Sequence, residues 1–430
     1  MRFKSKQTLA MTTQKLIIAA CSALVILTGC GSTNTTRSAP LMVGPGANMQ
    51  SGPSKKVYSY NSDIYLDVAI PVFNPGFPID QNTGNVDYEE LGEMDIWPQL
   101  RRAEAKRFAI QTKQAMEKTK AFGSISNVPD ANTTADLFIL GTVNHSDSEE
   151  VILGVTVMDS SGEIWGQQDF EHTVSQYFFR DAENKGENPY EPVFTQITDY
   201  VYDLLKGLSE DDKQTIKNTT MVRYAQYYSP EVFNQYIDST IKKKGKLKYY
   251  KFDLVGMPAD DDNMIKRIET LRAQDLLFVD KLQNQFEAFD AETEVAYRRW
   301  QEETLPQVAK AREAKAERNT KVALGVLAGV AAALLAKNSG SSMGQAASIV
   351  GGVAAAWSLK DAYQANESLK VHRAVIDEMG QGLDIDLSPT VMDFKDKSIE
   401  LTGTASEQYQ QWKAHLRDIY ELEATPDVSL

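Results

Sequence analysis

Apolar residues alternate or recur at helical spacing in distinct stretches of the first half of the chain. Short β-favouring runs bounded by turn residues predict strands at residues 64–70, 135–143, 151–158 and 163–174. Apolar residues at helical spacing, opposite a charged face, predict helices at residues 98–120 and 192–205. This combination predicts a sandwich-like α/β domain over residues 57–207, at the start of an α+β chain.

A second pattern, with one apolar stripe on an otherwise charged surface, marks long helices further along. The stripe runs from Met264 to Thr304, and Pro306 is expected to kink or interrupt the helix. A returning helix should end at Gly380 and Gly382, which predicts a long helical hairpin over residues 264–381.

The tip of this hairpin, residues 322–359, is rich in Gly and Ala. Val322 to Ala336 is wholly apolar, and a second apolar run, Ala346 to Leu359, follows a polar turn. Small residues recur at every fourth position, which lets helices approach closely, as in small-xxx-small pairs. The candidate membrane or oligomer contacts are therefore Gly325, Gly329, Ala333, Gly340, Gly344, Ser348, Gly352 and Ala356.

Three arrangements of this tip stay open. Each arm of about 15 residues would be roughly 22 Å long, shorter than a hydrocarbon core of about 30 Å, so a simple two-span protein is not favoured. The hairpin can dip into a membrane, pack several subunits together as a glycine zipper, or lie buried within the monomer.

The two remaining segments have weaker patterns. Residues 208–263 are a mixed connecting region with a strand expected at 245–255, and its basic patch, Lys242 to Lys244, fits a solvated edge strand. Residues 382–430 predict a small strand-helix cap, with a strand at 398–402 and a helix at 407–420.

The N-terminus has the pattern of an export signal. Four positive residues precede an apolar run from Leu16 to Leu27 that is too short to span a membrane. The following tetrapeptide, Leu27 to Cys30, resembles the lipobox of bacterial lipoproteins. The resemblance implies removal of residues 1–29 and acylation of Cys30, whereas the alternative is a plain secretory signal with a chance cysteine.

By the same resemblance, Gly31 implies sorting to the periplasmic face of the outer membrane, with membrane lipid bound through the acyl chains, palmitate among them. Residues 30–56 are rich in Ser, Thr, Asn, Gly and Pro and predict a flexible tether.

Composition excludes several kinds of site. The signal peptide carries four positive charges and no negative one, so its removal changes the formal net charge from −14 to −18, which disfavours nucleic-acid partners. Cys21 leaves with the signal peptide and Cys30 is acylated, so the mature chain has no free thiol for a disulfide, a zinc cluster or a nucleophile.

The α/β segment also carries a family resemblance. The strand Ala135 to Gly141 and the hairpin Asp159 to Trp165 resemble motifs of the α/β domain shared by curli secretion-channel lipoproteins and the TolB N-terminal domain. The resemblance covers residues 57–207 and implies envelope assembly and secretion work, without catalytic residues.

The four histidines have no partner at metal-ligand spacing, and no phosphate-binding loop, nucleophile elbow or His-Glu-x-x-His helix is present. Asp384 and Asp386 fit ordinary solvation on one strand face better than metal binding. We therefore expect no metal and no cofactor, and a non-enzymatic assembly or secretion accessory that self-associates or meets other envelope proteins. The alternative is a lipoprotein enzyme or binding protein that acts on an envelope polymer.

Overall fold

The computed structural model describes residues 56–94, 96–245, 247–259, 262–336 and 370–424, with side chains up to Glu313 in the fourth range. The named helices and strands all lie within the unit Tyr58–Leu430, one of the two units into which the chain divides. Helices occur together with a mixed five-stranded sheet, so the predicted α+β class is confirmed at this level.

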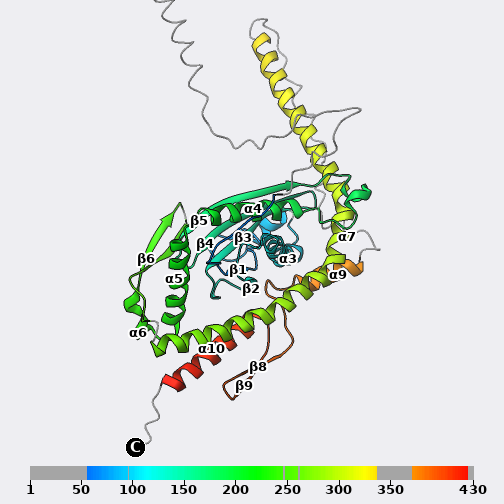
Figure 1. Cartoon of the computed structure of the whole chain (residues 1–430). Coiled ribbons are helices and arrows are strands. Elements are labelled where there is room, and N and C mark those ends of the chain that lie inside the picture. Colours follow the sequence, from blue (N-terminus) through cyan, green and yellow to red (C-terminus); the bar gives the residue numbers. More distant parts are fainter. Residues whose placement is uncertain (1–55, 95, 246, 260–261, 337–369, 425–430) are drawn as a thin grey trace, which may run out of the picture. The chain divides into compact units, whose positions relative to one another are not determined.

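The central sheet has the strand order β2-β1-β3-β4-β5 (Figure 1). β1 pairs in parallel with β2 and β3, whereas β3, β4 and β5 pair antiparallel. Four of these strands fall where the sequence predicts them, and β2 is additional. The strands are β1 (Val68–Pro71), β2 (Ile125–Val128), β3 (Leu137–Ser146), β4 (Glu150–Asp159) and β5 (Ile164–Thr173).

The core lies between one face of this sheet and two helices, α3 (Pro98–Glu117) and α4 (Glu191–Lys206), both predicted from the sequence. Strand β4 buries alternate residues, such as Val155 and Val157, because successive side chains point to opposite faces. Phe108 of α3 meets Phe194 of α4 at a ring-centroid distance of 5.7 Å above this face. The opposite face of the sheet is only half-buried.

Short elements connect the sheet to the long helix. Helix α5 (Glu210–Tyr228) begins with a capping box in which Ser209 and Asp212 exchange hydrogen bonds. After it, β6 (Ile237–Lys244) and β7 (Leu247–Leu254) form a two-stranded antiparallel sheet beside α5 (Figure 1), and β7 falls on the predicted strand. The others are α2 (Tyr88–Glu93), η1 (Phe178–Arg180), η2 (Ala182–Asn184), α6 (Pro230–Phe233) and η3 (Asn234–Tyr236).

Helix α7 (Asn263–Ala336) is a single helix of 74 residues. Asp262 caps its start by accepting a hydrogen bond from the Met264 amide. The helix does not end at Pro306, so the expected interruption there is not observed. Leu305 and Val308 are buried beside the proline, and this packing offsets the cost of about 3 kcal/mol for the lost hydrogen bond.

The C-terminal elements pack along α7. Helix α9 (Lys370–Met379) contacts α7 and α3, and α10 (Ala405–Ala424) runs beside the first part of α7 (Figure 1). Phe278 of α7 stacks on Tyr409 and Trp412 of α10, each at a centroid distance of 6.0 Å. The predicted strand is β9 (Lys397–Leu401), which pairs with β8 (Thr390–Phe394).

Candidate functional site

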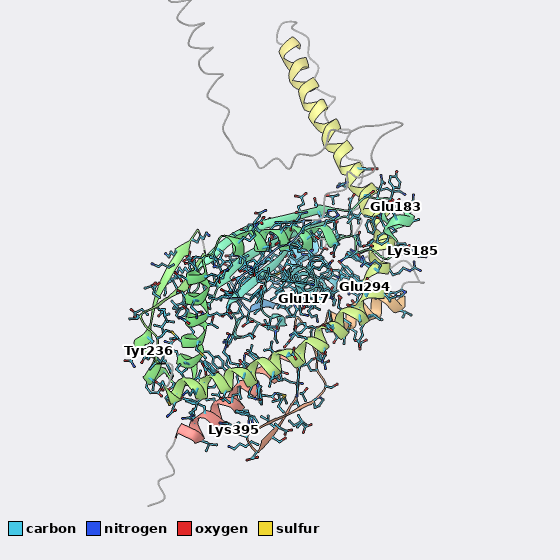
Figure 2. All side chains as sticks on the ribbon, viewed as in Figure 1. Glu117, Glu183, Lys185, Tyr236, Glu294 and Lys395 are labelled. Atoms are coloured by element: carbon cyan, nitrogen blue, oxygen red, sulfur yellow. The ribbon has the colours of Figure 1, made fainter. Side chains whose placement is uncertain are left out.

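A buried ion cluster attaches α7 to α3. The Arg107 side chain of α3 is fully buried and donates to the Thr293 hydroxyl at 2.7 Å and to the Asp290 carbonyl at 2.9 Å. It also forms an ion pair with Glu294, labelled in Figure 2, and lies 4.8 Å from the ring centroid of Tyr297. These four partners follow the i, i+3, i+4, i+7 spacing of one helix face, so a single guanidinium fixes the rotation of α7 about its axis.

A second buried group, Glu104, lies one turn before Arg107 on α3. Its carboxylate accepts hydrogen bonds from Ser146 of β3 at 2.7 Å, from Tyr297 of α7 at 2.9 Å and from Arg101 at 3.2 Å. Burial raises the pKa of Glu104 even though all three donors favour the charged form. One carboxyl group therefore connects the sheet, α3 and α7.

The sequence-predicted contact residues occupy the far end of α7 and the segment after it. Gly325, Gly329 and Ala333 lie in the helical backbone of α7. The other expected contacts, Gly340, Gly344, Ser348, Gly352 and Ala356, lie outside the described residues, as does Cys30. Whether the two arms associate thus stays a prediction. Among the residues that the structure describes, no helix combines the length and apolarity needed to cross a bilayer.

The distance from the folded body to these small residues follows from helix geometry. Arg312 of α7 forms an ion pair with Glu149 at 2.8 Å. The helix continues from there to Ala336, a rise of roughly 36 Å at about 1.5 Å per residue. The α7 backbone thus extends well past this attachment point (Figure 1).

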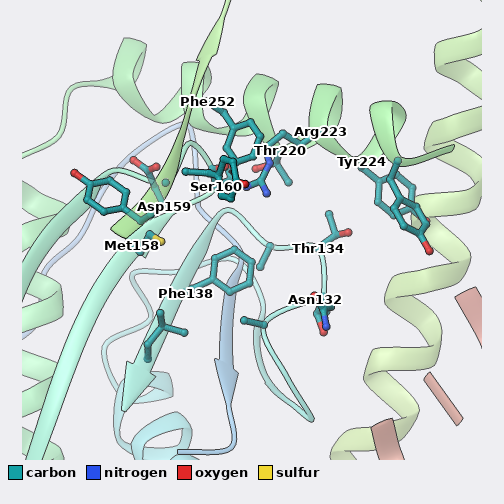
Figure 3. Close-up of a pocket in the computed structure, with 18 of the residues that line it drawn as sticks. Asn132, Thr134, Phe138, Met158, Asp159, Ser160, Thr220, Arg223, Tyr224 and Phe252 are labelled. Carbon is teal, nitrogen blue, oxygen red and sulfur yellow. Dashed lines mark hydrogen bonds between the residues drawn. The ribbon is translucent and has the colours of Figure 1, made fainter. Parts of the chain in front are cut away.

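A pocket of about 430 Å³ lies on the half-buried face of the sheet (Figure 3). Phe138 and Met158 contribute from β3 and β4, Arg223 and Tyr224 from α5, and Phe252 from β7. Six of the 19 lining residues are aromatic, and their rings offer surfaces for an apolar or planar ligand. The other lining residues are Ala131, Asn132, Thr133, Thr134, Ala135, Leu140, Asp159, Ser160, Gly162, Thr220, Tyr227, Tyr249, Tyr250 and Lys413.

Two cationic side chains lie over aromatic rings at this pocket. The Arg223 guanidinium lies 3.9 Å from the Phe252 ring centroid and donates to the Ser160 carbonyl. The Lys413 ammonium lies 4.5 Å from the Tyr227 centroid and donates to the Asn132 carbonyl at 3.2 Å. Burial lowers the pKa of both cations. The lining therefore pairs apolar surface with positive charge.

Asp159 is the one carboxylate among the described residues that line the pocket. One oxygen accepts the backbone amides of Ser161 at 2.8 Å and Glu163 at 3.1 Å, and the other accepts the Trp165 indole at 2.9 Å. These bonds hold the β4–β5 turn, so the Asp159 to Trp165 motif has a structural role here. Hydrolysis by a pair of carboxylates would need a second carboxylate beside Asp159, and the described lining of the pocket has none.

Within the described ranges, no cluster of three or more His, Cys, Asp or Glu side chains could hold a metal ion. Asp384 accepts the amides of Ile385 and Ser406, and Asp386 forms one isolated bridge to Thr404, so the expected strand at these aspartates is wrong. The hydrogen bond from the Ser406 amide, in the first turn of α10, gives the Asp384 carboxylate a structural role at the start of this helix.

Sequence reasoning did not identify Arg223 and Lys413 as pocket residues. They belong to helices 190 positions apart, and no local pattern brings these helices together. Of the neighbouring tyrosines, Tyr224 and Tyr228 are buried, whereas Tyr227 is 42% exposed. In comparisons with protein-family models, with curated proteins and with solved structures, nothing matched this chain.

Proposed function

We propose that this chain is an exported lipoprotein, anchored through acylated Cys30 at the periplasmic face of the outer membrane. In this proposal it acts as a non-enzymatic assembly or secretion accessory, and residues 322–359 bring subunits together or enter a membrane. Its partners are membrane lipid, further copies of the chain and other envelope proteins. The finer layout belongs to the same proposal: a sandwich-like α/β domain, then a helical hairpin with an apolar tip, then a small strand-helix cap.

The observation that carries this proposal is the continuity of α7. One helix begins against the C-terminal helix, passes the Arg107 cluster and continues into the apolar run Val322 to Ala336. A continuous helix joins the folded body to the small-residue stripe, so the orientation of the one is coupled to the direction of the other. Such coupling suits an assembly protein, because it aligns neighbouring subunits through their tips.

The return path supports the same arrangement. Helix α9 comes back along α7, and Trp97 donates to Asp377 of α9 at 3.1 Å. Lys106 of α3 donates to the carbonyls of Met379 and Gly382 at 2.7 and 3.0 Å, which fixes the end of α9. Both ends of the segment that contains the tip are thus attached to the same body.

A double substitution, Gly329→Leu with Gly352→Leu, tests the proposal. Two leucines would separate helices that approach through the small-residue stripe, so the mass of the detergent-extracted complex should fall while the melting temperature stays the same. The matched control is Ala331→Leu with Ala354→Leu, which adds bulk two positions away, on the opposite side of each arm, and should leave the mass unchanged.

A different result for the double Leu variant would contradict the proposal. An unchanged mass together with a lowered melting temperature would show that the tip is buried in the monomer and overpacked, at a typical cost of about 1 to 3 kcal/mol per site. The assembly proposal would then be rejected.

The second candidate, a protein that binds an envelope polymer, draws on the aromatic pocket. Arg223 over Phe252 and Lys413 over Tyr227 provide stacking surfaces and charge for an anionic polymer segment. Phe138→Ala would weaken polymer binding in a sedimentation assay under this candidate. Equal binding by the variant and by the unaltered protein would remove the pocket from consideration.

A further inference from the structure

The sheet formed by β6 and β7 ends in a concentrated basic region. Six lysines fall between positions 242 and 251, and no Asp or Glu occurs from Ser239 to Phe252. The chain as a whole has a net charge of −14, so this ribbon is locally opposite in sign to the rest of the protein. Electrostatic attraction to an anionic partner would therefore concentrate here.

Cross-strand pairing brings like charges together near the end of the ribbon. Lys243 of β6 is directly opposite Lys248 of β7, and both are exposed, as are Lys242 and Lys244. In the described part of the chain, no salt bridge forms at any of these four ammonium groups. Facing like charges destabilise a strand pair, and a negatively charged surface would offset that cost.

Large apolar side chains are exposed on the same ribbon. Ile241 and Tyr250 are directly opposite each other, with 63% and 59% of their surfaces exposed, and Leu247 near the turn is 42% exposed. Strand alternation places the Ile241–Tyr250 pair on the same face as the Lys243–Lys248 pair. This face therefore carries an apolar pair with lysines beyond it, whereas Leu247 lies on the opposite face with Lys242 and Lys244.

The base of the ribbon is fixed to the main sheet. The Phe252 amide donates to the Ser161 carbonyl at 2.7 Å, and Lys251 forms an ion pair with Glu163 at 3.2 Å. Gly162 makes this approach possible, since a Cβ there would lie 2.0 Å from the Tyr250 carbonyl oxygen. The ribbon is thus held at one end while its basic end is exposed.

We propose that the β6–β7 ribbon binds the surface of a bilayer that contains anionic phospholipid. Lysines beside exposed aliphatic and aromatic side chains are the combination that suits a headgroup region, where ammonium groups meet phosphates and Ile241, Leu247 and Tyr250 leave water. A soluble polyanion supplies charge but no apolar phase for these three residues. Pairing with the edge of a second copy is opposed by the lysines.

This contact does not depend on the acyl anchor or on the small-residue tip. It can therefore be tested in the mature chain from Gly31 onward, produced without the signal peptide and without Cys30. Co-sedimentation with vesicles of phosphatidylethanolamine and phosphatidylglycerol should show binding that weakens with salt, whereas phosphatidylcholine vesicles should bind far less. Replacing Lys242, Lys243, Lys244 and Lys248 with Ser should weaken binding about fivefold per lysine, and on the order of 100-fold or more together. A variant with Arg at all four positions should retain vesicle binding.

The matched control removes the same charge elsewhere, through Lys118→Ser, Lys120→Ser, Lys185→Ser and Lys397→Ser, all at exposed positions. Retained binding in this control, with loss in the ribbon variant, supports the proposal. Equal loss in both, or retained binding in the ribbon variant, would overturn it. Ile241→Ser with Tyr250→Ser should also weaken vesicle binding. If this variant binds vesicles as well as the unaltered protein does, and the unaltered protein also binds soluble polyglutamate, the ribbon is a polyanion site. That result would contradict the bilayer proposal.

Discussion

The phenol of Tyr297 on α7 donates a hydrogen bond to the carboxylate of Glu104 on α3 at 2.9 Å, in a fully buried position. The same ring lies against the Arg107 guanidinium. Tyr297 therefore contacts both charged groups of the joint between the two helices. Through this joint, the long helix keeps a fixed orientation on the α/β core.

Removing this hydrogen bond should destabilise the joint. Tyr297→Phe keeps the ring and deletes the hydroxyl, which leaves the buried Glu104 carboxylate with one donor fewer. We expect a loss of about 1 to 3 kcal/mol in the free energy of unfolding, measured in urea. Tyr250→Phe, at an exposed ring, is the matched control and should change stability little. Equal stability of the two variants would show that the bond contributes nothing.

Gly162 should be essential for the position of the β6–β7 ribbon. It has φ +80° and its missing Cβ makes room for the Tyr250 carbonyl, so Gly162→Ala combines backbone strain with a steric clash. We expect faster amide hydrogen exchange throughout β6 and β7. Gly245→Ala is a matched control. Gly245 has φ +62° with open space around it, so alanine there adds backbone strain without a steric clash. The same exchange pattern in both variants would contradict the clash.

Local patterns account for most of the strands and helices. Alternation along β4 and the turn at Ser160 to Gly162 correctly gave the β4–β5 hairpin, and the stripe from Ile268 to Phe289 gave the buried face of α7. These features are readable because burial on one face imposes a period of 2 or 3.6 on the sequence. Strand β2 escaped prediction since its four residues include Ser126 and Asn127, which do not favour strands.

Long-range polar contacts were beyond the reach of such patterns. Arg107 and Lys106 look like ordinary surface charges of an amphipathic helix, yet both are buried by elements more than 180 positions away. The same holds for the pocket, which forms only when α5, β7 and α10 meet the sheet. The interruption expected at Pro306 is absent for a related reason: the cost of a proline follows a local rule, whereas its tolerance depends on tertiary packing.

The pH dependence of stability should reveal Asp275 of α7. Burial raises the pKa of this carboxyl to about 6, although Lys413 and the Tyr409 hydroxyl favour its charged form. The folded state then binds a proton more tightly than the unfolded state. Its contribution to stability is fully present below the unfolded pKa of 3.8 and is lost as the pH rises through about 6.

Comparison with Asp275→Asn isolates this group. Between pH 4 and pH 7 the unaltered protein should lose about 2 kcal/mol of unfolding free energy relative to the Asn variant, which is most of what a pKa shift of about two units provides. Urea unfolding at several pH values measures the difference. A difference that does not change with pH would show that the Asp275 pKa is the same in both states.

The most direct test of the central claim, that this is a lipid-anchored protein, is the covalent state of Cys30. Metabolic labelling with a fatty-acid probe in a bacterial host should label the full chain, and mass spectrometry should find an N-terminus at an acylated Cys30. Cys30→Ser should remove the label and leave unprocessed precursor, because the thiol accepts the lipid before cleavage. Undiminished label on the Ser variant, or a mature protein whose Cys30 carries no lipid, would contradict the account.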